Sequence, residues 1–298
     1  MTKLAHNSRY REHMSLSRGA RVRGVLLGLT ISLGLLGLTV AIALPGAVEN
    51  SMNKVELNNY VDIPDSTEKV HRDLTIVDMH ADTLLWDRDL NEWSVRGHVD
   101  VPRLQAGNVA IQVFSSVSKT PKGQNYKSNS ADSDNIRLLS MVQGQPIRTW
   151  NSPLQRSLYH AEKLQQAAKK SDGTLHLIHD RGELADFLTA RQMKPNIVGA
   201  IFSVEGLHNL EGDFKNVAKL HKAGMRMAGF THFFDNELAG SMHGEKKGGL
   251  TKFGVQVFDE LERTGVIVDI AHASPKAVDD MLKRATKPVV SSHGGVQA

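Results

Sequence analysis

The sequence has 298 residues, of which 40% are hydrophobic and 23% are charged, the composition of a globular protein and not of a disordered one. Six of its basic side chains and one acidic side chain lie within residues 1–23, so the rest of the chain nets −1 out of a formal charge of +4. That near-neutral body argues against nucleic-acid binding, and the absence of cysteine excludes disulfides and thiolate ligands. Any metal site must therefore use histidine and carboxylate ligands.

The basic segment 1–23 is followed by an uncharged run of twenty residues, Val25–Leu44. As a helix this run would extend roughly 30 Å, the thickness of the bilayer hydrocarbon. We therefore predict a transmembrane anchor over residues 24–48, with the body outside the cytoplasm, on the periplasmic or extracellular side. The alternative is a signal peptide cleaved near Ala41–Ala43 or Pro45–Ala47, which would release a secreted form.

A polar linker is expected over residues 49–70, and the catalytic body over residues 71–298. Short β-branched or apolar runs predict strands at Leu74–Met79, Val109–Val117, Ile197–Val204, Met227–Thr231, Val266–Ile270 and Pro288–Ser291. Helical spacing predicts helices at Ser157–Lys170, Asn216–Ala223, Phe253–Thr264 and Pro275–Ala285. Strands that alternate with helices indicate parallel βα units. The polar stretch Ser118–Asp134 reads as a long surface loop.

Metal-binding side chains follow five of the six predicted strands. In chain order they are His80 with Asp82, Glu205, His232, His272 and His293. The carboxyl ends of parallel strands open onto one face, where such barrels place their active sites. These residues are therefore expected to converge on one point.

The spacing of these residues suggests a site for two metal ions. Residues i and i+2 of an extended segment point to the same side, so His80 and Asp82 can hold one ion. His272 and His293 would hold a second ion, with Glu205 bridging the two through its two oxygens. Nitrogen and oxygen ligands suit catalytic Zn²⁺, although Mn²⁺, Co²⁺ and Fe²⁺ remain open.

Each of these residues also has a structural interpretation. Asp82 could cap a helix beginning near Thr83. Glu205 could be a turn residue, and His232 a core histidine beside two phenylalanines. His272 could be a helix cap, although Ser274 before Pro275 is the better N-cap.

Four further polar residues are expected to have supporting or structural roles. Asp269 lies in a predicted buried strand, and we interpret it as support for a metal ligand. The remaining histidines of the same region, His208, His221 and His243, are expected to be surface or structural residues.

The chain from about Leu74 to Val296 resembles the membrane (renal-type) dipeptidase family of zinc metallopeptidases. The matching stretches, in order, are VDMHADTLLW, GHVDVPRLQAGNVAIQVFSSV, SVEGLHNL, GMRMAGFTHFFDNELAGS, GGLTKFGVQVFDELERTGVIVDIAHAS and PVVSSHGG. Several blocks in the same order make the resemblance far more specific than a lone His-x-Asp.

The resemblance implies an α/β fold, a (β/α)8 TIM-type barrel of the metallo-dependent hydrolase kind, with two Zn²⁺ per chain. It implies that His80 and Asp82 bind one zinc, that His272 and His293 bind the other, and that Glu205 bridges them and takes part in catalysis. His232 would stabilise the oxyanion while a bridging hydroxide attacks a dipeptide.

The chain departs from the family pattern at its C-terminus. Family members continue past the last zinc histidine, and that part supplies an Arg for the substrate carboxylate and an Asp for proton transfer. We count about six strands where a closed barrel needs eight. The expectation is a barrel truncated after residue 298, with its last strands missing.

Two other functions stay open. Another two-metal amidohydrolase is less favoured, because such sites more often begin with His-x-His. A non-catalytic, membrane-anchored binding protein is the alternative outside enzymes, whereas a solely structural membrane protein would leave the His/Asp/Glu set unexplained. The expected partners are a dipeptide substrate and a membrane contacted through the N-terminal helix, without nucleic acid. A homodimer is left open.

Overall fold

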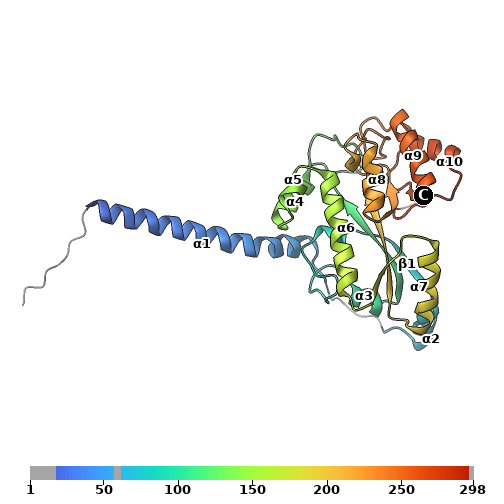
Figure 1. Ribbon diagram of the computed structural model, residues 1–298, viewed down its shortest axis with the longest axis horizontal. Helices are drawn as coiled ribbons and strands as arrows, with labels where there is room; N and C mark the ends of the chain where they lie inside the picture. The colour runs from blue at the N-terminus through green and yellow to red at the C-terminus, as the bar shows by residue number, and fades with distance from the viewer. Residues whose placement is uncertain (1–17, 57–61, 295–298) are drawn as a thin grey trace, which may run out of the picture. The chain divides into compact units, whose positions relative to one another are not determined.

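The computed structural model describes residues 18–56 and 62–294. Residues 1–17 of the basic segment, residues 57–61 of the expected linker and residues 295–298 lie outside the described residues. The chain forms two compact units, Met1–Gly46 and Ala47–Ala298. Figure 1 labels their elements, which in chain order are α1 (Arg18–Met52), α2 (Asp65–Asp73), β1 (Ile76–Ala81), η1 (Thr83–Leu85), α3 (Val101–Ala106), β2 (Val109–Val117), α4 (Asn135–Val142), α5 (Ile147–Trp150), α6 (Pro153–Lys170), β3 (Leu175–Leu177), α7 (Arg181–Met193), β4 (Val198–Glu205), η2 (Leu207–Leu210), α8 (Lys215–Lys222), β5 (Met225–Gly229), α9 (Lys252–Thr264), β6 (Ile267–Asp269) and α10 (Pro275–Arg284).

Helix α1 contains the apolar run Val25–Leu44 and is long and apolar enough to cross a membrane. The two threonine side chains of the apolar run are satisfied within the helix, since the Thr30 and Thr39 hydroxyls donate to carbonyls one turn back. Anchors and signal sequences share this length and composition. The helix continues beyond residue 48, the predicted end of the span, to Met52.

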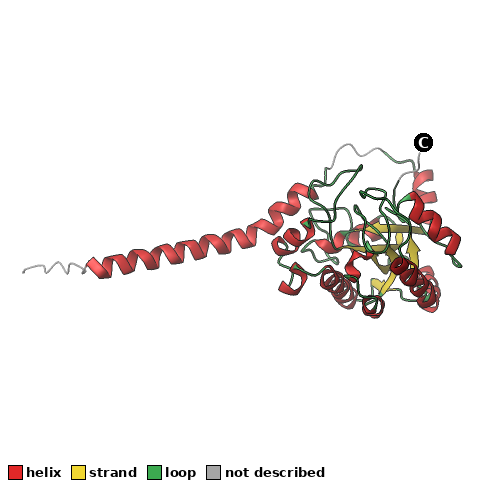
Figure 2. Cartoon of the chain, turned by 90° about the horizontal axis from the view of Figure 1, so that it is seen from above, coloured by secondary structure: helices red, strands yellow, loops and turns green. Residues whose placement is uncertain are grey.

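The strands of the body form one curled, parallel sheet with helices packed around it (Figure 2). Its order is β1-β2-β4-β5-β6, and the short strand β3 pairs with the first residues of β4. Strand β4 is central, because it pairs with β2 from Gly199 to Glu205 and with β5 from Phe202 to Glu205. Since the strands are parallel, the residues that follow them meet at one edge of the sheet.

Five of the six predicted strands are present, and the four predicted helices correspond to α6, α8, α9 and α10. The sixth predicted strand, Pro288–Ser291, pairs with β6 through one bridge, Asp269 with Val290. The prediction missed β3, whose three residues Leu175–Leu177 are too few to show a periodic pattern. Thus the structure has the parallel βα arrangement that the sequence predicted.

Helix α9 shows how the core is built. Its apolar face is buried, since Val257, Phe258 and Leu261 have no solvent exposure. The Thr251 hydroxyl caps the first turn by accepting from the amide of Gly254, and Gly265 ends the helix in the left-handed conformation (φ 78°) that glycine adopts without strain. Because the helix is fixed at both ends, its apolar face packs onto the sheet.

We predict that Phe258→Ala lowers the free energy of unfolding by about 3–5 kcal/mol, because it leaves a cavity in this core. The Phe258 ring is fully buried, with its centroid 6.0 Å from that of Phe230. Phe214→Ala is the matched control, because the Phe214 side chain is 41% exposed. Urea unfolding of the detergent-solubilised chain measures both, and equal losses would contradict this packing.

Candidate metal centre

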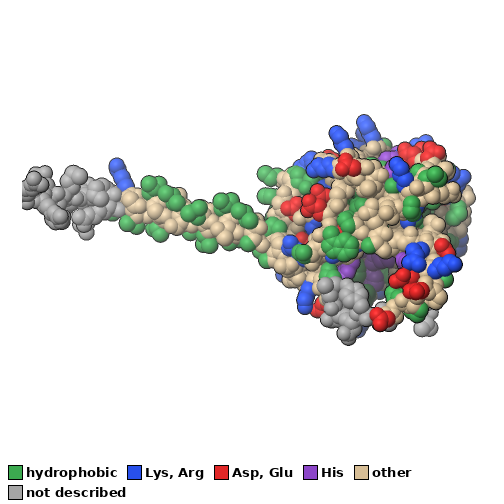
Figure 3. Space-filling view, turned by 90° about the horizontal axis from the view of Figure 1, so that it is seen from below, with side chains coloured by type: hydrophobic (Ala, Val, Ile, Leu, Met, Phe, Trp, Pro, Cys, Tyr) green, Lys and Arg blue, Asp and Glu red, His purple; other side chains and the backbone are tan. Residues whose placement is uncertain are grey.

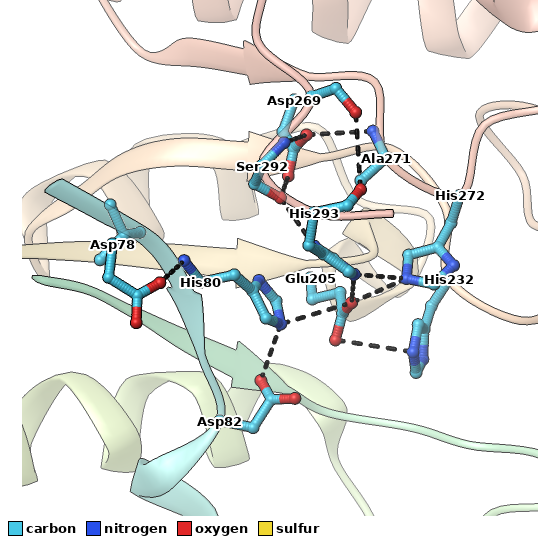
Figure 4. Close-up of polar contacts among 12 residues, drawn as sticks. Asp78, His80, Asp82, Glu205, His232, Asp269, Ala271, His272, Ser292 and His293 are labelled. Atoms are coloured by element: carbon cyan, nitrogen blue, oxygen red, sulfur yellow. Dashed lines mark hydrogen bonds and ion pairs between the residues drawn. The ribbon is translucent and has the colours of Figure 1, made fainter. Parts of the chain in front are cut away.

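The Glu205 carboxylate lies at the end of the central strand β4 and is surrounded by four imidazoles (Figure 4). Its side chain is only 6% exposed. From Oε1 the distances are 3.0 Å to Nε2 of His272, 3.2 Å to Nε2 of His293 and 3.7 Å to Nε2 of His80. From Oε2 the distance to Nε2 of His232 is 3.5 Å. Residues distant in sequence therefore converge on one carboxylate.

Asp82 joins this cluster through His80, whose Nε2 lies 3.4 Å from the aspartate Oδ1. The residue stands at the N-cap position of η1, but its side chain makes no capping hydrogen bond. The capping interpretation of Asp82 is therefore wrong. The i and i+2 side chains of this segment point to one place, as expected for an extended segment.

His272 is held in an unusual backbone conformation. Its φ is 62°, a left-handed value that is strained for a residue with a side chain. The loop at Ser241–Met242 holds His272 in this conformation. The amide of Met242 donates to the His272 carbonyl over 2.8 Å, and Ser241 forms an antiparallel β-bridge with Ala273. The helix cap is Ser274, as predicted, because its hydroxyl accepts from the amide of Ala277. The His272 side chain therefore does not cap the helix and points to the cluster.

Asp269, at the end of β6, supports His293 through Ser292. Its Oδ1 accepts from the amides of Ala271 and Ser292, and its Oδ2 accepts from the Ser292 hydroxyl over 2.5 Å. Because that hydroxyl donates its proton to Asp269, it can accept the Nδ1 proton of His293, 2.8 Å away. When a cation is bound beside Glu205, the lone pair of His293 therefore lies on Nε2 and can face that cation.

The electrostatics of the cluster favour a negative carboxylate at its centre. Burial alone would raise the pKa of Glu205, but the charge of His232 and hydrogen bonds from His272 and His293 outweigh it and hold that pKa well below its usual range. Burial also opposes the charge of His80, yet Asp82 and Glu205 together raise the pKa of His80 to about 9. Burial and the neighbouring Glu205 raise the pKa of Asp82.

The donor atoms fit bound metal ions. The Nε2 atoms of His272 and His293 are 2.9 Å apart, a separation at which both lone pairs can point to one cation. Among residues 18–56 and 62–294, Oε2 of Glu205 and Oδ1 of Asp82 are buried without a hydrogen-bond partner. Buried oxygens without a hydrogen bond are costly unless a cation satisfies them. Two ligand sets have their atoms within 4.8 Å of one another, namely His80, Glu205 and His293, and Glu205, His232 and His272.

The cluster forms the floor of a cavity of about 1110 Å³, which is visible as a hollow with histidine side chains inside it (Figure 3). His243, which we expected to be a surface or structural residue, lines this cavity. Its ring stacks on Phe233 at 4.5 Å and lies 5.5 Å from the ring of His272. The sequence offered no signal for it, because His243 lies in a loop and does not follow a strand.

The other two histidines do not reach the cavity. His208 is buried, with its Nε2 2.9 Å from the Ser118 hydroxyl, and His221 lies in the last turn of α8. Both therefore lie outside the cluster, as expected. His208 is buried inside the protein and is not a surface residue.

We predict that Gly206→Ala destabilises the protein far more than Gly212→Ala. Both glycines have positive φ values, 86° and 73°, so both substitutions strain the backbone by about 1–2 kcal/mol. Only at Gly206 would the added Cβ collide, 2.6 Å from Nδ1 of His208 and 3.2 Å from Cβ of His232, whereas nothing lies within 4 Å at Gly212. Thermal unfolding midpoints of the two variants measure the difference. Equal midpoints would show that the side chains around Gly206 are not tightly packed.

Comparisons with known proteins show that the chain is similar to dipeptidases. The chain is 24% identical over 247 residues to Dipeptidase aclJ from Aspergillus oryzae, covering 78% of this chain and 52% of that protein. It is 28% identical over 204 residues to Dipeptidase tcpJ from Claviceps purpurea, covering 68% and 43%. The chain thus spans about half the length of the curated relatives it matches.

Two solved structures share the fold. One is a metallo peptidase from Rhodobacter sphaeroides, liganded with a phosphinate mimic of the dipeptide L-Ala-D-Ala, with a TM-score of 0.57 at 19% identity and coverage of 74% of this chain and 65% of that one. The other is the probable dipeptidase PvdM from Pseudomonas aeruginosa, with a TM-score of 0.57 at 18% identity and coverage of 76% and 54%. The family model described as membrane dipeptidase (peptidase family M19) matches residues 65–298. The chain belongs to the membrane dipeptidase family.

Proposed function

We propose that the protein hydrolyses dipeptides with two zinc ions held at the cluster around Glu205. The observation that carries the proposal is the convergence of three imidazole Nε2 atoms, within 3.0–3.7 Å, on one buried carboxylate oxygen. His80 and Asp82 would hold one ion, His272 and His293 the other, and Glu205 would contact both. Family membership supports this assignment, because the family is one of metallopeptidases.

When bound, the two ions would polarise the substrate carbonyl and activate water at neutral pH. The protein's own side chains supply the charge and the orientation of the metal ligands. Glu205 keeps its negative charge in a buried place, and Asp269 orients His293 through Ser292.

His232 is the residue that we assign to the oxyanion. Its Nδ1 lies 3.3 Å from the carbonyl oxygen of Lys119, an acceptor that fixes the proton on Nδ1. Its Nε2 faces the cluster and donates a hydrogen bond only when the ring is protonated. Burial lowers the pKa of His232, while Glu205 opposes that effect. Negative charge developing on the substrate would favour the protonated ring, so the donor is strongest in the transition state.

Helix α1 would anchor the protein in a membrane, with the body on the outer side. Its length and composition suit a span. Basic residues precede the apolar run and acidic residues follow it, which favours this orientation. The proposed localisation is therefore periplasmic or extracellular.

We predict that the protein binds two zinc ions and that Glu205→Gln weakens both by at least ~100-fold, because the shared ligand loses its charge. Glu237→Gln is the control, since Glu237 is exposed. Zinc content after gel filtration and competition with a chromophoric chelator measure the binding. A chelator should abolish hydrolysis of dipeptides and zinc should restore it. Two bound zincs without turnover would leave a metal-binding protein and contradict the dipeptidase proposal.

We predict that His232→Gln lowers kcat by about 10²–10³-fold, because one donor to the oxyanion is lost, while zinc content stays at two. His176→Gln is the control, because the Nε2 of His176 lies 2.9 Å from the carbonyl oxygen of Gly173 and the residue does not line the cavity. Steady-state kinetics and zinc analysis are measured on the same preparations. Loss of zinc from the His232 variant would mean that this residue is a metal ligand instead.

A further inference from the structure

The last turn of α1 belongs to the body, since the second compact unit begins at Ala47. Within it, the Glu49 side chain is 3% exposed and forms ion pairs with Arg88 at 2.8 Å and Arg96 at 3.7 Å. The carbonyl oxygen of Asn53 accepts from the amide of Gly97 over 2.7 Å. This segment precedes the residues 65–298 that match the family, so the family pattern does not account for it.

Glu49 is connected to the metal centre through Arg88. The Arg88 guanidinium donates to the hydroxyl of Thr83 over 2.9 Å and to the carbonyl of Arg96 over 2.7 Å. Thr83 directly follows Asp82, and its hydroxyl donates to the carbonyl of Val99. Burial disfavours the charge of Arg88 and lowers its pKa, while Glu49 opposes that effect. The Glu49 carboxylate therefore fixes the position of the Arg88 guanidinium. The guanidinium in turn fixes Thr83, the residue next to Asp82.

The same turn contributes to the cavity wall. Val48 and Met52 line the cavity together with the ligands His80 and Asp82. Val48 packs against an apolar cluster made of Leu85, Trp86, Val117, Ile136 and Leu139. The cavity thus has an apolar wall beside its metal-binding floor, a wall that suits a large apolar side chain.

We propose that the segment Ala47–Asn53 is a working part of the site. Glu49 is a positioning residue that fixes Asp82 through Arg88 and Thr83. Val48 and Met52 form the wall that receives an apolar side chain of the substrate, a point that rests on the proposed dipeptidase function. The substrate class is therefore dipeptides with a bulky apolar residue.

Zinc binding to the full chain tests the positioning role without requiring turnover. Glu49→Gln should weaken the more weakly bound zinc by about 10-fold and speed hydrogen exchange of residues 83–88 in the zinc-free protein. Glu56→Gln is the matched control, because Glu56 is exposed and, among the described residues, pairs with the exposed Lys54. Both properties should stay unchanged in that control. Equal behaviour of the two variants would overturn the proposal.

A double-mutant cycle shows whether Glu49 acts through Arg88. Arg88→Gln alone should lower the zinc affinity as much as Glu49→Gln does. The double variant should lose no more zinc affinity than either single variant, because both substitutions break the same chain of contacts. Additive losses would overturn this path. Should Glu49→Gln fail to fold, Thr83→Val breaks the path at its other end. The same loss of zinc affinity is then expected, and normal affinity would contradict the proposal.

Kinetics with two dipeptides test the apolar wall. The double variant Val48→Ala/Met52→Ala should lower kcat/KM for Leu-Leu by about 10-fold, through the loss of apolar contact area, and leave Gly-Gly within about 2-fold. Ile63→Ala is the control, because Ile63 is 58% exposed and lies outside the cavity. Equal losses for both substrates would overturn the assignment of the wall. If the unaltered protein cleaves no dipeptide, the proposed function fails, while the zinc and exchange results still decide the role of Glu49.

Discussion

The structure depends on one buried negative charge, the carboxylate of Glu205 at the end of the central strand. Burying a carboxylate is costly unless cations or hydrogen-bond donors surround it. Here four imidazoles lie around it, contributed by His80, His232, His272 and His293. They lie at the end of β1, just after β5 and β6, and just after the bridge at Val290. The parallel sheet brings these carboxyl ends to one side, where they surround the charge.

A second layer of contacts fixes the directions of these side chains. Asp269 orients His293 through Ser292, and the backbone of His272 is held in a left-handed conformation by the loop at Met242. Gly206 leaves room for two histidine side chains where any larger residue would collide. The Glu49–Arg88 pair extends this layer to the last turn of α1. The site is therefore built from the packing of the whole body and not from the ligands alone.

Much of the fold and most of the candidate site could be predicted from the sequence. Continuous apolar runs such as Ile197–Val204 and the helical spacing of Phe253–Thr264 report burial directly, because one face or both faces of each element must leave water. Short or irregular features could not be predicted in this way. The three residues of β3 show no periodicity, and His243 lies in a loop whose path depends on contacts with Tyr126 and Phe233.

The sequence by itself determined the order of the βα units, the apolar N-terminal helix and the identity of the His, Asp and Glu side chains at the strand ends, because these are properties of local pattern. Their convergence could be predicted from the parallel strands, but only the tertiary structure gave its distances around Glu205. Only the tertiary structure decided that Asp269 acts through Ser292 and that the end of α1 forms part of the cavity wall. The physical reason is that such contacts join residues far apart in the chain, and their distances arise only when the sheet has curled and its helices have packed.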